Sequence, residues 1–188
     1  MHIIRLSLCL LFIAILGACS RVPKVQTQAN PQANFSDIKT FAVLPLPTQI
    51  TGADPGAMVE IAGPAKAAIV GDMEAKGYQQ VSQADADILV NLHGELLPRT
   101  QVIDTGIAPP PGYYGDPWIT GYPYASQQIV RNYEQGTLAI EISKNVGGQP
   151  QLEWVGWTTS KRAPGAKINV DNVVAGIHEI LADFPPEK

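Results

Sequence analysis

Five acidic and imidazole side chains are the residues whose type and spacing could support acid–base chemistry. Asp85 and Asp87 form a closely spaced carboxylate pair that could exchange protons with a substrate. Their neighbours are strand formers and aspartate favours turns, so we expect both to shape the turn into a strand. Glu134 could face a cleft, but we expect it to be a charged residue at the end of a strand. His93 falls on the polar face of an alternating strand, and His178 flanks the apolar side of a helix.

The sequence contains no G-x-S-x-G, H-E-x-x-H, C-x-x-C or phosphate-loop motif. A zinc site would need more ligands at useful spacing than His93 and His178 supply. We therefore expect no catalytic residue, no metal site and no cofactor. The formal net charge is −4, and the densest basic cluster is the pair Lys161–Arg162. A chain of this charge does not attract phosphate backbones, so we expect no nucleic-acid partner.

Cys19 has a clear chemical role. Leu6 to Leu16 is an apolar run of signal-peptide length, too short to span a bilayer, and Leu16-Gly17-Ala18 then precede the cysteine. This arrangement resembles the bacterial lipobox, in which small residues flank the cleaved bond and the thiol carries a diacylglycerol. Residues 1–18 are thus a lipoprotein signal peptide. The alternative is an ordinary cleavage site beside an incidental cysteine.

The membrane is the first partner that this anchor implies, because two or more acyl chains on Cys19 hold a protein stably at a bilayer. Ser20 follows the cysteine, whereas an aspartate there favours inner-membrane retention in Gram-negative bacteria. We therefore expect a protein held at the periplasmic face of the outer membrane, with inner-membrane retention as the alternative. Residues 19–34 are the lipidated N-terminus and tether, part of which could form an edge strand.

The segment 104–125 is the best candidate for contact with a partner. It contains three consecutive prolines and is rich in glycine and aromatic residues, which excludes regular structure. Aromatic side chains on a stiff backbone are typical of binding surfaces. The alternative is a lid that folds back over the sheet. Trp154 and Trp157 must face opposite sides of a strand, and we expect Trp157 to be the exposed one. The candidate partner-binding residues are Tyr113, Tyr114, Trp118, Tyr122, Tyr124 and Trp157.

Residues 35–188 are expected to form a single domain of the α/β (α+β) class. Strands are predicted at Thr40–Leu44, at Ala86–Leu97 with residues 98–103 as a candidate continuation, at Ile129–Tyr133, and as a hairpin of Thr137–Ser143 and Gln151–Ser160. Apolar spacing of three and four predicts helices over Ala57–Lys76 and Val170–Phe184. A mixed, mostly antiparallel sheet with both helices on one face is the economical way to bury these surfaces.

Several segments, in order over residues 34–186, resemble the domain-of-unknown-function 4136 family of bacterial lipoproteins. Residues 45–64 depart from the resemblance, because they are longer and richer in Gly and Pro. The resemblance implies a periplasmic α/β lipoprotein domain and no established activity. The matching segments are Asn34–Phe41, Lys76–Tyr78, Ala84–Val90, Tyr133–Leu138, Trp154–Trp157 and Phe184–Pro186.

These observations favour a non-enzymatic binding or accessory protein of the cell envelope whose partner is an unidentified envelope protein or ligand. Two alternatives remain. An envelope hydrolase would need a cleft with convergent polar groups and perturbed titration. A carrier of a small apolar ligand would show a sizeable cavity between the sheet and the helices.

Overall fold

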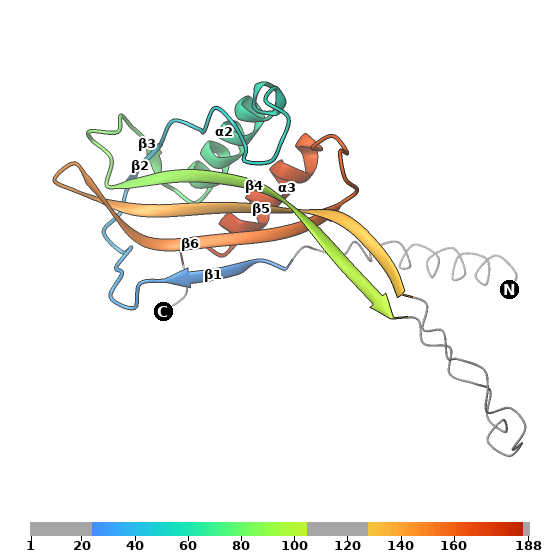
Figure 1. Ribbon diagram of the computed structural model, residues 1–188. Coiled ribbons are helices and arrows are strands. Elements are labelled where there is room, and N and C mark those ends of the chain that lie inside the picture. Colours follow the sequence, from blue (N-terminus) through green and yellow to red (C-terminus); the bar gives the residue numbers. More distant parts are fainter. Residues whose placement is uncertain (1–23, 105–127, 186–188) are drawn as a thin grey trace, which may run out of the picture.

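The computed structural model describes residues 24–104 and 128–185. Six strands and two helices form one domain in which α2 and α3 pack on the same face of a single open sheet (Figure 1). This confirms the predicted fold class. The elements are β1 (Gln26–Ala29), β2 (Thr40–Val43), α2 (Ala57–Ala75), β3 (Gln79–Gln80), β4 (Ile88–Asp104), β5 (Gln128–Val146), β6 (Gln149–Arg162) and α3 (Val170–Ala182).

The sheet is mixed, in the order β1-β6-β5-β4-β2-β3. The three pairs from β1 to β4 are antiparallel, and β4–β2 and β2–β3 are parallel. The edge strand expected in the tether is β1, which pairs with β6. The two-residue strand β3 was not predicted from the sequence, because it is too short to show a period.

The core lies between the sheet and the helices. Alternation along β4 turns Ile88, Val90 and Leu92 toward the helices, and α3 contributes Ile177 and Leu181. All five are at most 4% exposed. At about 1.5–3 kcal/mol per buried aliphatic side chain, this layer is the main source of the fold's stability.

The ends of the helices are set by local sequence. The side chain of Asn169 caps α3 by accepting hydrogen bonds from the backbone N–H groups of Asp171 (2.8 Å) and Asn172 (3.2 Å). Beyond α2, Gly77 has a φ of +92°, a left-handed conformation that glycine adopts readily and that ends the helix. Pro64 lies inside α2, and the helix runs through Gly63–Pro64 without a break.

A β-bulge corrects one part of the predicted pattern. Simple alternation puts Leu152 and Trp154 on the same face of β6. In the structure Ile142 pairs with Trp154 but Ser143 pairs with Leu152, so Glu153 is an extra residue. The bulge turns Leu152 away from the core, where it is 52% exposed, while Trp154 is 1% exposed.

The other correction concerns the length of the central strands. The predicted strands at Ile129–Tyr133 and Thr137–Ser143 are one strand, β5, of 19 residues. Its partner β4 runs on to Asp104, which the sequence had placed in the following loop. Residues 99–104 and 128–133 pair with each other and with no other strand of the described chain. We call this two-stranded ribbon the arm; it projects from one end of the sheet (Figure 1).

Within residues 24–104 and 128–185, none of the helices has the length and hydropathy needed to cross a bilayer.

Candidate functional site

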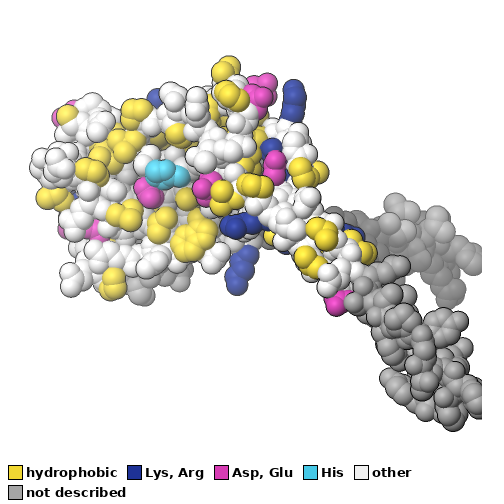
Figure 2. Space-filling view, in the orientation of Figure 1, with side chains coloured by type: hydrophobic (Ala, Val, Ile, Leu, Met, Phe, Trp, Pro, Cys, Tyr) yellow, Lys and Arg dark blue, Asp and Glu magenta, His cyan; other side chains and the backbone are white. Residues whose placement is uncertain are grey.

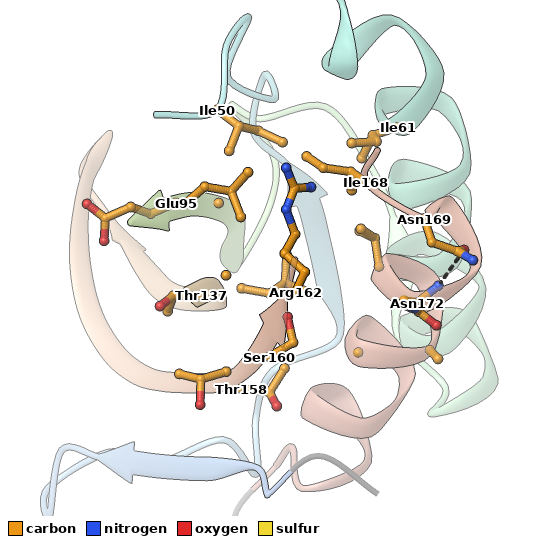
Figure 3. A pocket seen from close by; sticks show the side chains of 18 of the residues that line it. Ile50, Ile61, Glu95, Thr137, Thr158, Ser160, Arg162, Ile168, Asn169 and Asn172 are labelled. Carbon is orange, nitrogen blue, oxygen red and sulfur yellow. Dashed lines mark hydrogen bonds between the residues drawn. The ribbon is translucent and has the colours of Figure 1, made fainter. Parts of the chain in front are cut away.

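A cavity of about 750 Å³ opens between the sheet and the helices, at the end of the sheet from which the arm leaves. Its floor is formed by β4, β5 and β6, and one wall by α3. The segment that precedes α2 closes another side through Pro47 and Ile50 (Figure 3). The volume lies within the range of pockets that bind small molecules.

Aliphatic side chains from every neighbouring element make most of this wall. They come from the segment before α2, from α2, from β5, and from α3 with the chain leading into it. Such a lining favours an apolar ligand or the apolar part of an amphipathic one. The aliphatic residues that define it are Ile50, Met58, Ile61, Leu138, Ile168 and Val173.

Two glycines in the wall are close-packed. A Cβ atom at Gly136 would lie 3.1 Å from Oγ of Ser160 and 3.2 Å from Cδ2 of Leu96. At Gly176 a Cβ atom would lie 3.1 Å from Cδ2 of Leu138, so α3 approaches the sheet closely there. The cavity is therefore bounded by a packed wall rather than by loosely fitting side chains.

Arg162 stands in the cavity at the end of β6, with its guanidinium group between Ile50 and Ile168 (Figure 3). Its Nε donates to Oε2 of Glu134 on the neighbouring strand at 2.7 Å. The other oxygen of Glu134 accepts from the backbone N–H of Gly165 at 3.2 Å. The hydrogen bond from Arg162, then that from Gly165, lower the pKa of Glu134 below its ordinary value of 4.5.

The ion pair leaves part of the guanidinium group available. Nη1 of Arg162 is buried and has no hydrogen-bond partner within the described part of the chain. A buried donor of this kind carries a cost that a ligand with an acceptor, above all an anionic one, would remove. Arg162 lies on the same inward face of β6 as Trp154 and Thr158, because it is separated from them by an even number of residues.

Two further polar atoms of the cavity lining are buried and lack partners among the described residues. Oγ1 of Thr158 lies on β6, in a residue that is 6% exposed. Oε2 of Glu179 lies on α3, seven residues beyond Asn172 and so about 10 Å further along the helix. The cavity thus has polar atoms at separate points of an apolar wall.

The histidines have the structural roles predicted from the sequence. His93 lies on the outer face, where its Nε2 is 2.8 Å from Oε2 of Glu141 across the strands and 2.9 Å from Nδ2 of Asn91. His178 joins the helices through Nδ1, 2.8 Å from Oδ2 of Asp72. Both are exposed and lie outside the cavity lining.

The aspartate pair also has the predicted structural role. Oδ2 of Asp87 accepts hydrogen bonds from the backbone N–H groups of Lys39 (3.0 Å) and Thr40 (2.9 Å) and from the hydroxyl of Thr40 (2.8 Å). These bonds, with that from Lys39 the largest, lower the pKa of Asp87 below its ordinary value of 3.8. Asp85 accepts from the hydroxyl of Ser82 at 2.6 Å.

Most residues of the predicted partner-binding set lie outside the described residues, as does the predicted lipidation site Cys19. Trp157 is described: it pairs with Ala139 and Gln26 on the outer face and is partly exposed. The structure does not bring it to the cavity. The undescribed members are Tyr113, Tyr114, Trp118, Tyr122 and Tyr124.

Sequence reasoning missed the cavity residues Arg162, Thr158 and Glu179. For Arg162 a signal existed, because a cation at an inward position of an alternating strand needs a buried partner. Glu179 and Thr158 gave no comparable signal. Among the described residues, no three His, Cys, Asp or Glu side chains are grouped so that they could hold a metal ion.

Comparisons with known proteins describe the fold more than the activity. The family model described as "Domain of unknown function (DUF4136)" matches residues 25–186. No curated protein matches the chain. A PDZ domain protein from Parabacteroides distasonis has a similar structure, with a TM-score of 0.54 and 11% identity over 88% of this chain and 36% of that one. This chain therefore spans about a third of that protein's length.

Two further solved structures resemble the chain. One is a DUF4136 family protein from Bacteroides thetaiotaomicron, with a TM-score of 0.49 and 18% identity over 87% of this chain and 96% of that one. The other is a minor lipoprotein from Acinetobacter baumannii, with a TM-score of 0.35 and 12% identity over 78% of this chain and 88% of that one.

Proposed function

The chain belongs to the DUF4136 family, whose description assigns no activity, and we propose a function from the geometry of its cavity. The protein is a non-enzymatic binding lipoprotein of the cell envelope that holds a small amphipathic molecule between the sheet and the helices. Its ligand has an apolar body and an acceptor group, preferably an anionic one such as a carboxylate. Cys19 carries the lipid that holds the protein at the periplasmic face of the outer membrane.

The observation that carries this proposal is the unpartnered Nη1 of Arg162 in an otherwise aliphatic wall. The apolar body of a ligand would displace water from side chains such as Ile61, Leu138 and Val173. Its acceptor group would satisfy the buried guanidinium donor, which gives the complex an orientation as well as affinity. The combination selects amphipathic molecules over purely apolar ones.

The direction of the pKa shift next to the cavity supports binding rather than catalysis. The carboxylate of Glu134 lies beside the cavity. Its pKa is lowered, because Arg162 stabilises the ionised form. A general acid at neutral pH needs the opposite shift. Thr158 could serve as a nucleophile only with an adjacent base, and its Oγ1 has no partner among the described residues.

The proposal is tested by titrating the soluble chain 20–188 with undecanoic acid that carries a dansyl group. We expect saturable binding with blue-shifted dansyl emission, because the probe leaves water. Ser160→Phe, which fills the floor of the cavity, should weaken binding at least about tenfold, a change of about 1.4 kcal/mol.

The matched control is Leu152→Phe, on the opposite face of β6 at a half-exposed position that does not line the cavity. It adds the same aromatic surface without filling the cavity, and it should bind the probe as the unsubstituted chain does. Absence of saturable binding, or equal affinity of Ser160→Phe and the unsubstituted chain, would contradict the proposal.

A further inference from the structure

The arm carries a distribution of charge and apolar surface that the cavity does not explain. Two successive pairs near its described end, Val102 with Val130 and Ile103 with Ile129, are wholly aliphatic, and the polar pair Asp104 with Gln128 follows them. Successive pairs face opposite sides of a ribbon, so both faces of the arm are apolar at that point. Val102 is 56%, Ile129 42% and Val130 60% exposed. Within the described residues, these aliphatic side chains belong to no core cluster, so burial in that part of the chain does not explain them.

A group of cations lies next to these pairs. Arg99 and Arg131 are exposed on the arm, and neither forms an ion pair with any described residue. Lys161 lies at its base, with Nζ 4.7 Å from the centre of the Tyr133 ring. Figure 2 shows basic side chains where the arm leaves the body and apolar ones further along it.

Acidic residues are few in this region. Asp104 is at the end of β4, and Glu95 is on the same face as Arg99, four residues earlier. Glu134 is neutralised by Arg162. With Glu134 paired, the cations Arg99, Arg131 and Lys161 exceed the two remaining acidic residues by one charge, in a chain whose net charge is −4. An anionic surface is therefore the complementary partner for this part of the molecule.

The start of the described chain lies at the same end of the domain. β1 is antiparallel to β6, and Gln26 pairs with Trp157 while Ala29 pairs with Trp154. The chain before Gln26 therefore leads toward the end of β6 from which the arm projects (Figure 1). Cys19 is five residues before Lys24, and five residues can span at most about 17 Å.

We propose that the arm docks on an anionic phospholipid bilayer, with its aliphatic pairs in the interface and with Arg99, Arg131 and Lys161 against the lipid headgroups. Within the described arm the aliphatic pairs lie further from the body than Arg99, Arg131 and Lys161, so apolar side chains can enter the interface while the cations meet the headgroups. A soluble polyanion would engage the cations but would not cover Val102 and Val130. This docking rests on the proposed lipid anchor at Cys19, which brings the arm to the membrane surface.

The proposal is tested on the processed, lipidated protein in vesicles. After removal of residues 1–18, Cys19 is the sole cysteine and its thiol is blocked by the lipid. Val130→Cys then gives one free thiol for an NBD fluorophore. Val146→Cys is the matched control, because Val146 is similarly exposed (51%) but is the last residue of β5, at the opposite end of the strand from the arm.

In vesicles of phosphatidylethanolamine and phosphatidylglycerol, NBD at position 130 should shift to the blue and be quenched by doxyl-labelled lipids. NBD at position 146 should keep its aqueous emission. Replacing both arginines, Arg99→Gln and Arg131→Gln, should lower the ratio of docked to undocked arm about thirtyfold at low salt. Replacing phosphatidylglycerol by phosphatidylcholine should have a similar effect.

Three results would overturn docking of the arm. NBD at position 130 could stay aqueous in vesicles, or respond no more than NBD at position 146. It could also be blue-shifted before vesicles are added, which would show that another part of the chain covers the arm. The mass of the N-terminal peptide reports Cys19 lipidation separately, so failure of the anchor and failure of the docking are distinguishable. Dansyl-probe binding to the chain 20–188 is independent of both.

Discussion

The indole ring of Trp154 lies directly over the backbone of Gly156. A Cβ atom at Gly156 would be 2.5 Å from Cη2 of Trp154 and 2.7 Å from Cγ2 of Ile180 on α3. The absence of a side chain at Gly156 thus lets the largest core side chain and a helix meet over the same point of β6. Trp154 also meets Phe184 edge to face, with ring centroids 5.3 Å apart.

Gly156→Ala should therefore destabilise the domain by about 2–3 kcal/mol, because the added methyl group overpacks a closed core. Urea denaturation measures the effect. Gly71→Ala is the control: Gly71 lies within α2 and a Cβ atom there meets nothing within 4 Å. That variant should gain about 0.5–1 kcal/mol, because alanine is the better helix former. Equal effects of the two substitutions would contradict the packing described.

Asp87→Ala should cost about 2 kcal/mol at pH 7, because three hydrogen bonds to the carboxylate are lost. The pKa of Asp87 is lowered in the folded state, so its contribution is present above the ordinary value of 3.8 and disappears as the pH falls through the folded-state pKa. Denaturation curves should converge at that acidic limit. If Asp87→Ala were destabilised as much at the acidic limit as at pH 7, the charge of Asp87 would not be the source of its contribution.

The bulge at Glu153 predicts different costs for two leucines. Leu152→Ser should change the free energy of unfolding by no more than about 0.5 kcal/mol, because Leu152 faces solvent. Leu92→Ala should cost about 2–4 kcal/mol, because Leu92 is 4% exposed in the core. Chemical denaturation of both variants tests the register. Similar losses would place Leu152 back on the face of Trp154.

Arg162→Gln should distinguish ligands by their polar group. The variant loses the charged donor Nη1, so its affinity for the dansyl-labelled acid should fall about tenfold to a hundredfold. Its affinity for the methyl ester of the same probe should be nearly unchanged. Fluorescence titration of both compounds measures the difference. An equal loss for acid and ester would show that the substitution distorts the wall rather than removing a specific contact.

The parts of the fold that could be predicted from the sequence are those in which apolar residues recur at the period of a strand or a helix. The alternation of Ile88, Val90 and Leu92, and the helical spacing of Ile61, Ala65 and Ile69, each specify one buried face. The bulge at Glu153 could not be predicted, because an extra residue in a strand leaves no mark on composition or period.

The arm and the cavity were less accessible to such reasoning. Val102, Val130 and their neighbours mix polar and apolar residues without a clear period, since neither face of the arm packs on the core of the described domain. The role of Arg162 depends on Glu134, 28 positions earlier in the chain, and on the space between β6 and α3. Such relations arise only when the strands are in register.

The measurement that tests ligand binding in the cavity most directly is methyl NMR of the soluble chain 20–188 during titration with dodecanoate. The account predicts saturable shifts for the cavity methyl groups of Ile61, Leu138 and Val173. The methyl groups of Leu152 on the opposite face should stay unchanged. Shifts confined to exposed positions such as Leu152, or no saturable shift at any cavity methyl group, would contradict it.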